Sequence, residues 1–210
     1  MRIPTMFAAI VAGIVLSSFS GSKTIIVTST AFANNGPIPV KYTCLGPEFS
    51  PPLQFSNVPP EAKSIAIIVV EPNATVRVTQ QKVCIPQKTT VKARGKRVKY
   101  ATKKTTGTPY ETVQAKTCFT HWLIWNIEPN SNFIPENFIN DNQGLNSANE
   151  CRYKGMCPPE GTHNYHFKVY ALDTKLNISK KSDRATLEKV MEGHILAWGE
   201  VVGTFNKNYK

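Results

Sequence analysis

Two stretches of almost uninterrupted apolar residues dominate the hydrophobic pattern of this chain. Ser64–Val70 and Phe119–Ile127 both have the length of a strand and contain few polar side chains. Such runs are typical of central strands that are buried on both faces of a sheet. The first run is followed by Glu71-Pro72-Asn73, where we expect the chain to leave the sheet, because proline cannot supply a ladder N–H group.

A third stretch, from Cys157 to Asp173, changes character part-way along. It begins with the pair Pro158-Pro159, which fixes the backbone, and it then alternates between apolar and polar residues. In a strand, residues two apart share a face, so His163, Tyr165 and Phe167 are expected on one side. This pattern predicts a rigid rim beside a pocket, with an imidazole and a phenol at the start of a strand.

The remaining pattern predicts short strands joined by turns, and one helix. We expect a surface loop over residues 128–150. Leu187, Val190, Met191 and His194 have helical spacing, and Ser182 or Asp183 is a suitable N-cap. The other expected strands are Thr24–Thr30, Ile38–Cys44, the extended edge segment Ser50–Ser56 and the final strand His194–Phe205. Together these elements predict a mainly β domain (α+β) with one or two short helices.

The first 22 residues have the pattern of a secretory signal peptide. Arg2 precedes the apolar run Met6–Leu16, and small polar residues follow it. An uncleaved anchor is the alternative, although the run is short for a bilayer span. We therefore expect a periplasmic or secreted protein and an oxidising compartment, which suits the five cysteines of the chain. Because five is odd, at least one thiol is unpaired or pairs between chains.

The charge of the chain is concentrated in one insert. Residues 75–118 hold eleven of the 25 Lys and Arg residues and one of the 14 acidic residues, so they carry +10 of the formal net charge of +11. The insert could form a two-stranded ribbon with a turn at Arg94-Gly95-Lys96, or a disordered loop. It could also dock on an anionic membrane or polymer surface. Nucleic-acid binding is disfavoured, because few aromatic residues are interleaved with the basic ones.

Six motifs follow one another in a distinctive order along the chain. They are Gly36-Pro37-Ile38-Pro39 with Tyr42-Thr43-Cys44, Ser50-Pro51-Pro52-Leu53, His121-Trp122 with Asn126-Ile127, Cys157-Pro158-Pro159 with His163 and Tyr165-His166-Phe167, Tyr170-Ala171-Leu172-Asp173, and Met191-Glu192-Gly193-His194. In this order they resemble the phosphatidylethanolamine-binding protein family, also called the Raf-kinase-inhibitor-like family, and its bacterial branch in particular. The likeness covers roughly residues 24–205 apart from the insert, within an expected domain of residues 23–206.

The resemblance implies an antiparallel β-sandwich with a small pocket for a phosphate-type anion or a phospholipid head group. It places eight residues at that pocket: Glu71, Asn73, His121, Cys157, Pro158, Pro159, His163 and Tyr165. The family pattern has two aspartates where this chain has Glu71 and Asn73, so this wall carries one negative charge fewer and should repel an anion less. Two imidazoles beside one carboxylate can present charged N–H donors. We expect His121 and His163 to bind the anion and Tyr165 to contribute its hydroxyl.

The family also implies a binding protein, as a monomer or homodimer, that needs no cofactor, performs no catalysis and could modulate a protein target. Two other classes remain open. One is a hydrolase that uses the two histidines or Cys157 as its reactive groups. The other is a protein inhibitor that contacts its target through the basic insert. Glu71, His121 and His163 could also be read as a metal site, but no close ligand spacing supports this.

Two disulfides are predicted in the exported domain. Cys44–Cys157 would tie an early turn to the rim of the pocket, and Cys84–Cys118 would close the base of the insert. Connectivity does not follow from sequence, so Cys151 is an alternative partner in place of either Cys157 or Cys118.

Overall fold

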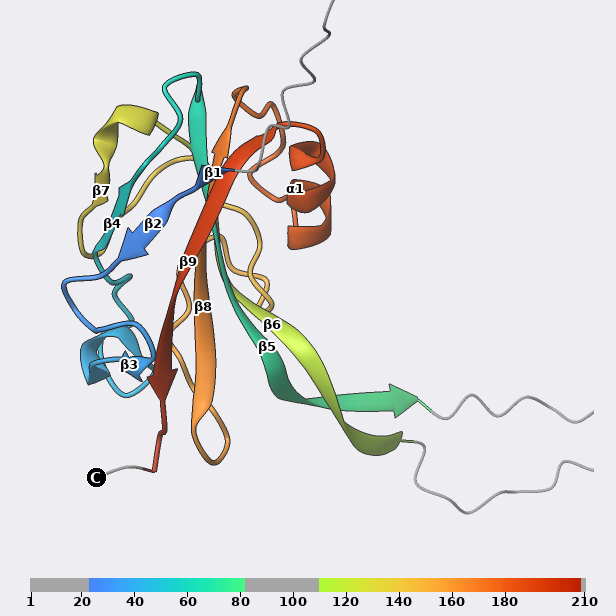
Figure 1. The fold of residues 1–210 in the computed structure, drawn as a ribbon. Coiled ribbons are helices and arrows are strands. Elements are labelled where there is room, and N and C mark those ends of the chain that lie inside the picture. Colours follow the sequence, from blue (N-terminus) through green and yellow to red (C-terminus); the bar gives the residue numbers. More distant parts are fainter. Residues whose placement is uncertain (1–22, 82–109, 209–210) are drawn as a thin grey trace, which may run out of the picture.

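The computed structural model describes residues 23–81 and 110–208. The protein is mainly β, as the sequence predicts, and two sheets lie face to face (Figure 1). One α-helix, α1 (Arg184–Met191), and two short 3-10 turns complete the described part. The strands are β1 (Lys23–Thr24), β2 (Ile26–Thr28), β3 (Gly36–Pro37), β4 (Leu53–Ser56), β5 (Ser64–Gln81), β6 (Tyr110–Ile127), β7 (Phe133–Ile134), β8 (His163–Leu172) and β9 (Ile195–Phe205). No helix in these residues is long and apolar enough to cross a membrane.

The larger sheet has the order β1-β9-β8-β5-β6, and β3 also pairs with β9. Its four long strands, β9, β8, β5 and β6, are antiparallel to one another. β1 and β3, of two residues each, run parallel to β9. The smaller sheet, β2-β4-β7, is antiparallel throughout. The predicted antiparallel sandwich is therefore confirmed, with two short parallel strands at its margin.

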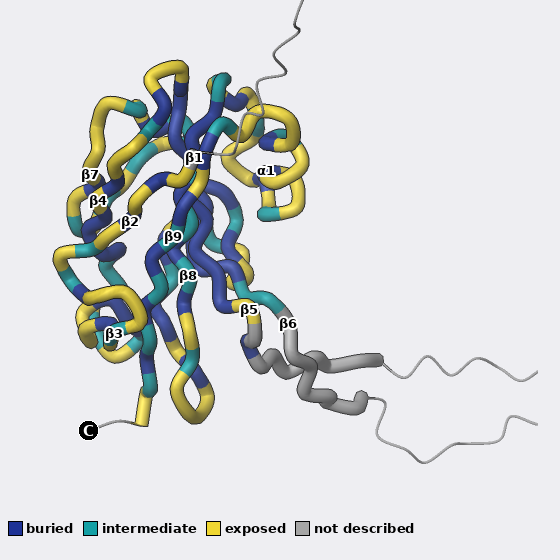
Figure 2. Tube along the Cα trace, viewed as in Figure 1, coloured by how far each residue is buried: buried dark blue, intermediate teal, exposed yellow. Residues whose placement is uncertain are grey.

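The apolar run that opens β5 is continuous because both of its faces are buried. Ile65, Ile67 and Val69 face the smaller sheet in the main core, whereas Ile68 and Val70 belong to a second cluster on the outer face. The position between β8 and β6 explains this, since a central strand has neither an open edge nor a solvated face. Figure 2 shows the dark blue of buried residues along the centre of the sandwich.

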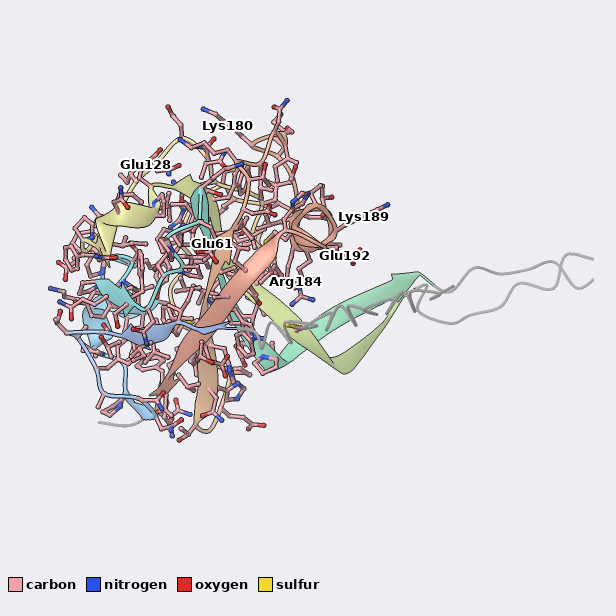
Figure 3. All side chains as sticks on the ribbon, turned by 45° about the horizontal axis from the view of Figure 1, so that its top comes forward. Glu61, Glu128, Lys180, Arg184, Lys189 and Glu192 are labelled. Atoms are coloured by element: carbon pink, nitrogen blue, oxygen red, sulfur yellow. A yellow bond between two sulfur atoms is a disulfide. The ribbon has the colours of Figure 1, made fainter. Side chains whose placement is uncertain are left out.

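Helix α1 covers the second cluster. It begins where Asp183, as predicted, accepts a hydrogen bond of 2.9 Å from the backbone N–H of Thr186. Leu187 and Met191 are buried against the outer face of the larger sheet. Lys189 points away from the sheet (Figure 3). The helix ends at Met191, so His194 lies beyond it.

Three predicted strand assignments were wrong in detail. Thr24–Thr30 divides at the buried Ile25 into β1 and β2, which belong to different sheets. Within Ile38–Cys44 the chain forms a 3-10 turn, Val40–Tyr42, where backbone groups bond three residues apart instead of pairing with a strand. Gln54–Ser56 is not an edge segment, because β4 lies between β2 and β7.

The chain also does not leave the sheet at Glu71-Pro72-Asn73, contrary to the prediction. A register shift between Glu71 and Ala74 absorbs the irregularity, and β5 continues to Gln81, paired with β6 from Tyr110 onward. The arms of the insert are thus a two-stranded ribbon. The predicted turn at Arg94-Gly95-Lys96 and the predicted signal peptide lie outside the described residues. Residues 128–150 are not purely a surface loop, since they include β7 and the buried Ile134.

Candidate functional site

Four polar side chains from three neighbouring strands meet at the inner face of the larger sheet. Glu71 comes from β5, His121 from β6, and His163 and Tyr165 from β8. Because β5 lies between β8 and β6, a carboxylate on β5 is placed between the imidazoles of the flanking strands. Three of the four are buried, since Glu71 is 6%, His121 3% and Tyr165 0% exposed. The site therefore lies within the sandwich.

A bulge in β6 turns His121 into the site. Val69 pairs with Trp122, whereas Val70 pairs with Thr120, so His121 is the extra residue. A bulge re-aims side chains and interrupts the strict alternation of a strand. His121 and Trp122 can therefore both be buried although they are consecutive.

Glu71 bridges the two imidazoles. One of its oxygens, Oε1, accepts a hydrogen bond from Nδ1 of His163, and the other, Oε2, lies 3.7 Å from Nε2 of His121. The second distance is that of an ion pair rather than a hydrogen bond. Burial on its own would raise the pKa of Glu71, but the contacts with His121 and His163 and the charges of the two rings lower it below its usual value. Glu71 is accordingly ionised at neutral pH.

Both ring nitrogens of His163 face protein oxygens. Nδ1 faces Glu71, and Nε2 lies 2.9 Å from the backbone carbonyl of Glu160. Only the imidazolium form has two N–H donors, so it is the form that satisfies both acceptors. In this arrangement both ring nitrogens have protein partners, and the expected direct donation of His163 to an anion stays a prediction.

His121 and Tyr165 have polar atoms that remain unsatisfied. His121 Nδ1 donates to the Lys154 carbonyl at 2.8 Å, but its Nε2 and the Tyr165 hydroxyl are buried without a hydrogen-bond partner among the described residues. The two rings pack edge to face with centroids 5.3 Å apart. Burial, followed by the negative charge of Glu71, raises the pKa of Tyr165, so its hydroxyl keeps its proton and can donate.

An unsatisfied buried donor costs about 1–3 kcal/mol, so two of them side by side indicate a place for an acceptor. Because Nδ1 of His121 already carries a proton, Nε2 is a second N–H donor in the imidazolium form of the ring. The two groups come from β6 and β8, the strands on either side of β5, and as donors they can hold an oxygen atom of an anion. Within the described residues, no cluster of His, Cys, Asp or Glu side chains could hold a metal ion.

The other residues expected at the pocket differ in how far they are buried. Pro158 is buried, whereas Cys157 and Pro159 are exposed. Asn73 lies in the irregular part of β5, and its side chain is outside the described part of the structure. Cys157 forms the predicted disulfide with Cys44, with a Cα–Cα distance of 5.4 Å. Because its sulfur is bonded, Cys157 offers no thiol nucleophile for the hydrolase alternative.

The second predicted disulfide is not seen. Cys118 and Cys151 are free thiols, and Cys84, the expected partner of Cys118, lies outside the described residues. Cys151 is exposed and free, so it does not take the place of Cys157 in the bond to Cys44.

Two functional groups escaped sequence reasoning. The backbone carbonyls of Lys154 and Glu160 accept the outer N–H groups of His121 and His163, respectively. Any residue has a carbonyl, so no side-chain pattern could have indicated these positions. The polar loop and the turn that hold them are the parts of the chain with the weakest periodicity.

Known proteins share this fold and part of this sequence. A model of the phosphatidylethanolamine-binding protein family matches residues 28–90 and 105–206. The chain belongs to this family. A UPF0098 protein of Pyrococcus horikoshii is 36% identical over 196 residues, which is 88% of this chain and 78% of that protein. A UPF0098 protein of Chlamydia trachomatis is 34% identical over 183 residues, covering 87% of this chain and 99% of the relative.

Solved structures agree with this membership. The crystal structure of a phosphatidylethanolamine-binding protein homologue from Chlamydia trachomatis, CT736, has a TM-score of 0.66 and 32% identity, and the match covers 89% of this chain and all of the other. Escherichia coli YbcL has a TM-score of 0.63 at 22% identity, covering 89% of this chain and 99% of YbcL, and therefore supports the fold alone. The resemblance inferred from the ordered motifs is confirmed.

Proposed function

We propose that this member of the family binds a small phosphate-type anion or a phosphorylated head group, without turning it over, at His121 and Tyr165. The observation that carries the proposal is a pair of buried polar atoms, His121 Nε2 and the Tyr165 hydroxyl, that have no hydrogen-bond partner in the described part of the chain. An anionic oxygen at this point accepts from both. Such charge-assisted bonds are roughly twice as strong as neutral ones.

The charge balance of the site favours an anion. One carboxylate, Glu71, lies between two imidazoles, so the cluster carries a net charge of about +1 when both rings are protonated. The family name, phosphatidylethanolamine-binding, supports a phosphorylated head group as the ligand class.

Titration with inorganic phosphate and with phosphoethanolamine, followed by NMR of the histidine rings, tests the proposal. The ring resonances of His121 and His163 should shift with increasing ligand, whereas His166 and His194, which pair with Glu200 and Asp173, should not. Tyr165→Phe removes one donor and should weaken binding about 3- to 10-fold, the value of one hydrogen bond. Unchanged His121 and His163 resonances at millimolar ligand would refute the proposal.

Export is part of the same proposal. It is supported by the apolar run Met6–Leu16 and by the Cys44–Cys157 disulfide, because such bonds persist in oxidising compartments. Fractionation of cells that express the full chain, with detection of the disulfide by thiol labelling, tests it. Recovery of the reduced protein in the cytosolic fraction alone would contradict export.

A further inference from the structure

The turn that precedes β8 supplies an acceptor to the site. The Glu160 carbonyl lies 2.9 Å from Nε2 of His163, three residues further along the chain. The turn, Cys157–Thr162, is exposed apart from Pro158 and includes Gly161 with φ +73°. It is anchored at one end by the Cys44–Cys157 disulfide and continues at the other into β8.

The acceptor of His121 is held differently. The Lys154 carbonyl accepts from His121 Nδ1 while the Lys154 N–H donates to the His121 carbonyl at 2.9 Å. The Lys154 ammonium lies 3.5 Å from Glu48, and the hydroxyl of the adjacent Tyr153 donates to the Tyr42 carbonyl at 2.9 Å. None of these contacts includes Cys44 or Cys157, so we expect Lys154 to stay in place when the disulfide is lost.

We infer that the Cys44–Cys157 disulfide positions His163 through the Glu160 carbonyl, and that reduction of this bond selectively releases His163 and weakens the anion site. The effect on anion affinity rests on the proposed function, whereas the effect on His163 does not. Without a carbonyl at Nε2, the imidazolium loses one of its two acceptors. The positive charge next to Glu71 is then less well stabilised, and the site attracts an anion less.

The chemistry requires a dithiol reductant. One thiolate attacks a sulfur of the Cys44–Cys157 bond to give a mixed disulfide, and the second thiol then closes the reductant into its own disulfide. The S–S bond breaks, each cysteine sulfur gains one electron and one proton, and the reductant is oxidised by two electrons. Cys157 is exposed, so the reductant can reach the bond.

The first test compares imidazole NMR spectra of the full chain, without ligand, before and after treatment with dithiothreitol. The His163 resonances should shift or broaden on reduction, whereas those of His121, His166 and His194 should stay within their line widths. An unchanged His163 ring overturns the inference. A change of all four rings together also overturns it, because it shows that the bond maintains the fold rather than one side chain.

Two variants separate the positioning role from general stability. Gly161→Ala keeps the disulfide and introduces no contact within 4 Å, but it strains a backbone of positive φ in the turn. It should reproduce the His163-selective change in the oxidised protein. Cys44→Ser/Cys157→Ser should show the same spectrum with and without dithiothreitol. Where that variant fails to fold, the Gly161→Ala spectrum decides, and an unshifted His163 ring in it contradicts the inference.

Phosphate titration then measures the consequence for binding. The reduced protein should bind inorganic phosphate about tenfold more weakly than the oxidised protein, which corresponds to roughly one hydrogen bond to a charged group. Equal or tighter binding after reduction refutes the redox effect on the site. If neither form binds phosphate, the proposed function fails, and the ring spectra still decide whether the disulfide positions His163.

Discussion

Replacement of Glu71 by glutamine removes the charge that holds the site together while keeping the size of the side chain. Glu71 is 6% exposed, and the side chains of His121 and His163 are 4% and 15% exposed, so water screens the three groups poorly. With an effective dielectric constant of about 20, Coulomb's law gives about 4.5 kcal/mol for a charged pair at the 3.7 Å that separates Glu71 Oε2 from His121 Nε2. Desolvation offsets part of this. Loss of one partner from a buried pair costs about 3–5 kcal/mol, so we expect a loss of about 3 kcal/mol in the free energy of unfolding at pH 7.

The pH dependence distinguishes charge loss from a packing defect. The pKa of Glu71 is lower in the folded protein than in the unfolded chain, so its contribution is complete above the unfolded pKa, about 4.3, and is lost as pH falls through the folded pKa. The wild-type protein and Glu71→Gln should therefore converge in acid, where the glutamic acid is neutral in both the folded and the unfolded state.

Urea unfolding at pH 7 and at a series of acidic pH values measures both effects. Glu192→Gln is the matched control, because Glu192 is an exposed residue just after α1 (Figure 3), and this change should alter stability by less than about 0.5 kcal/mol. The reasoning is refuted if Glu71→Gln is as mild as the control, or if the difference from wild type is the same at pH 7 and in acid.

Two further predictions concern the packing and the covalent frame. Leu187→Ala removes a fully buried side chain between α1 and the larger sheet and should lower the free energy of unfolding by about 2–5 kcal/mol. Lys189→Ala, on the exposed side of the helix, should lower it by less than about 0.5 kcal/mol. Urea unfolding of both variants checks this, and equal midpoints would contradict the packing described for α1. The Cys44–Cys157 bond spans 113 residues, for which loop-closure entropy predicts about 5 kcal/mol of stabilisation. The fall in unfolding free energy of Cys44→Ser/Cys157→Ser measures it, and a change below about 1 kcal/mol would show that the unfolded chain is little constrained by the bond.

Local patterns were sufficient where one residue type has one structural consequence. The continuous apolar run Ser64–Val70 predicted a strand buried on both faces, and the alternation after His163 predicted which side chains of β8 face inward. Ser182 or Asp183 was predicted as the helix cap, and Asp183 is the cap, because its carboxylate accepts from a first-turn N–H group. The ordered motifs were specific enough to indicate the family.

Local patterns failed where a non-local partner decides. Proline at position 72 predicted the end of the strand, but an irregularity in the pairing with β6 accommodates it and the strand continues. Gln54–Ser56 was expected at an edge because of the preceding prolines, yet partners on both sides come from residues distant in sequence.

The sequence by itself determined the mainly β composition and the pairing candidates among the cysteines, and it predicted Glu71, His121, His163 and Tyr165 as site residues. Only the tertiary structure decided how these four side chains are arranged. The order β8-β5-β6 places one carboxylate between two imidazoles, and the Glu160 carbonyl lies against the second ring nitrogen of His163. The physical reason is that the partners of a side chain depend on which strands lie next to it and on where backbone carbonyls fall. The type of a residue does not encode either of these.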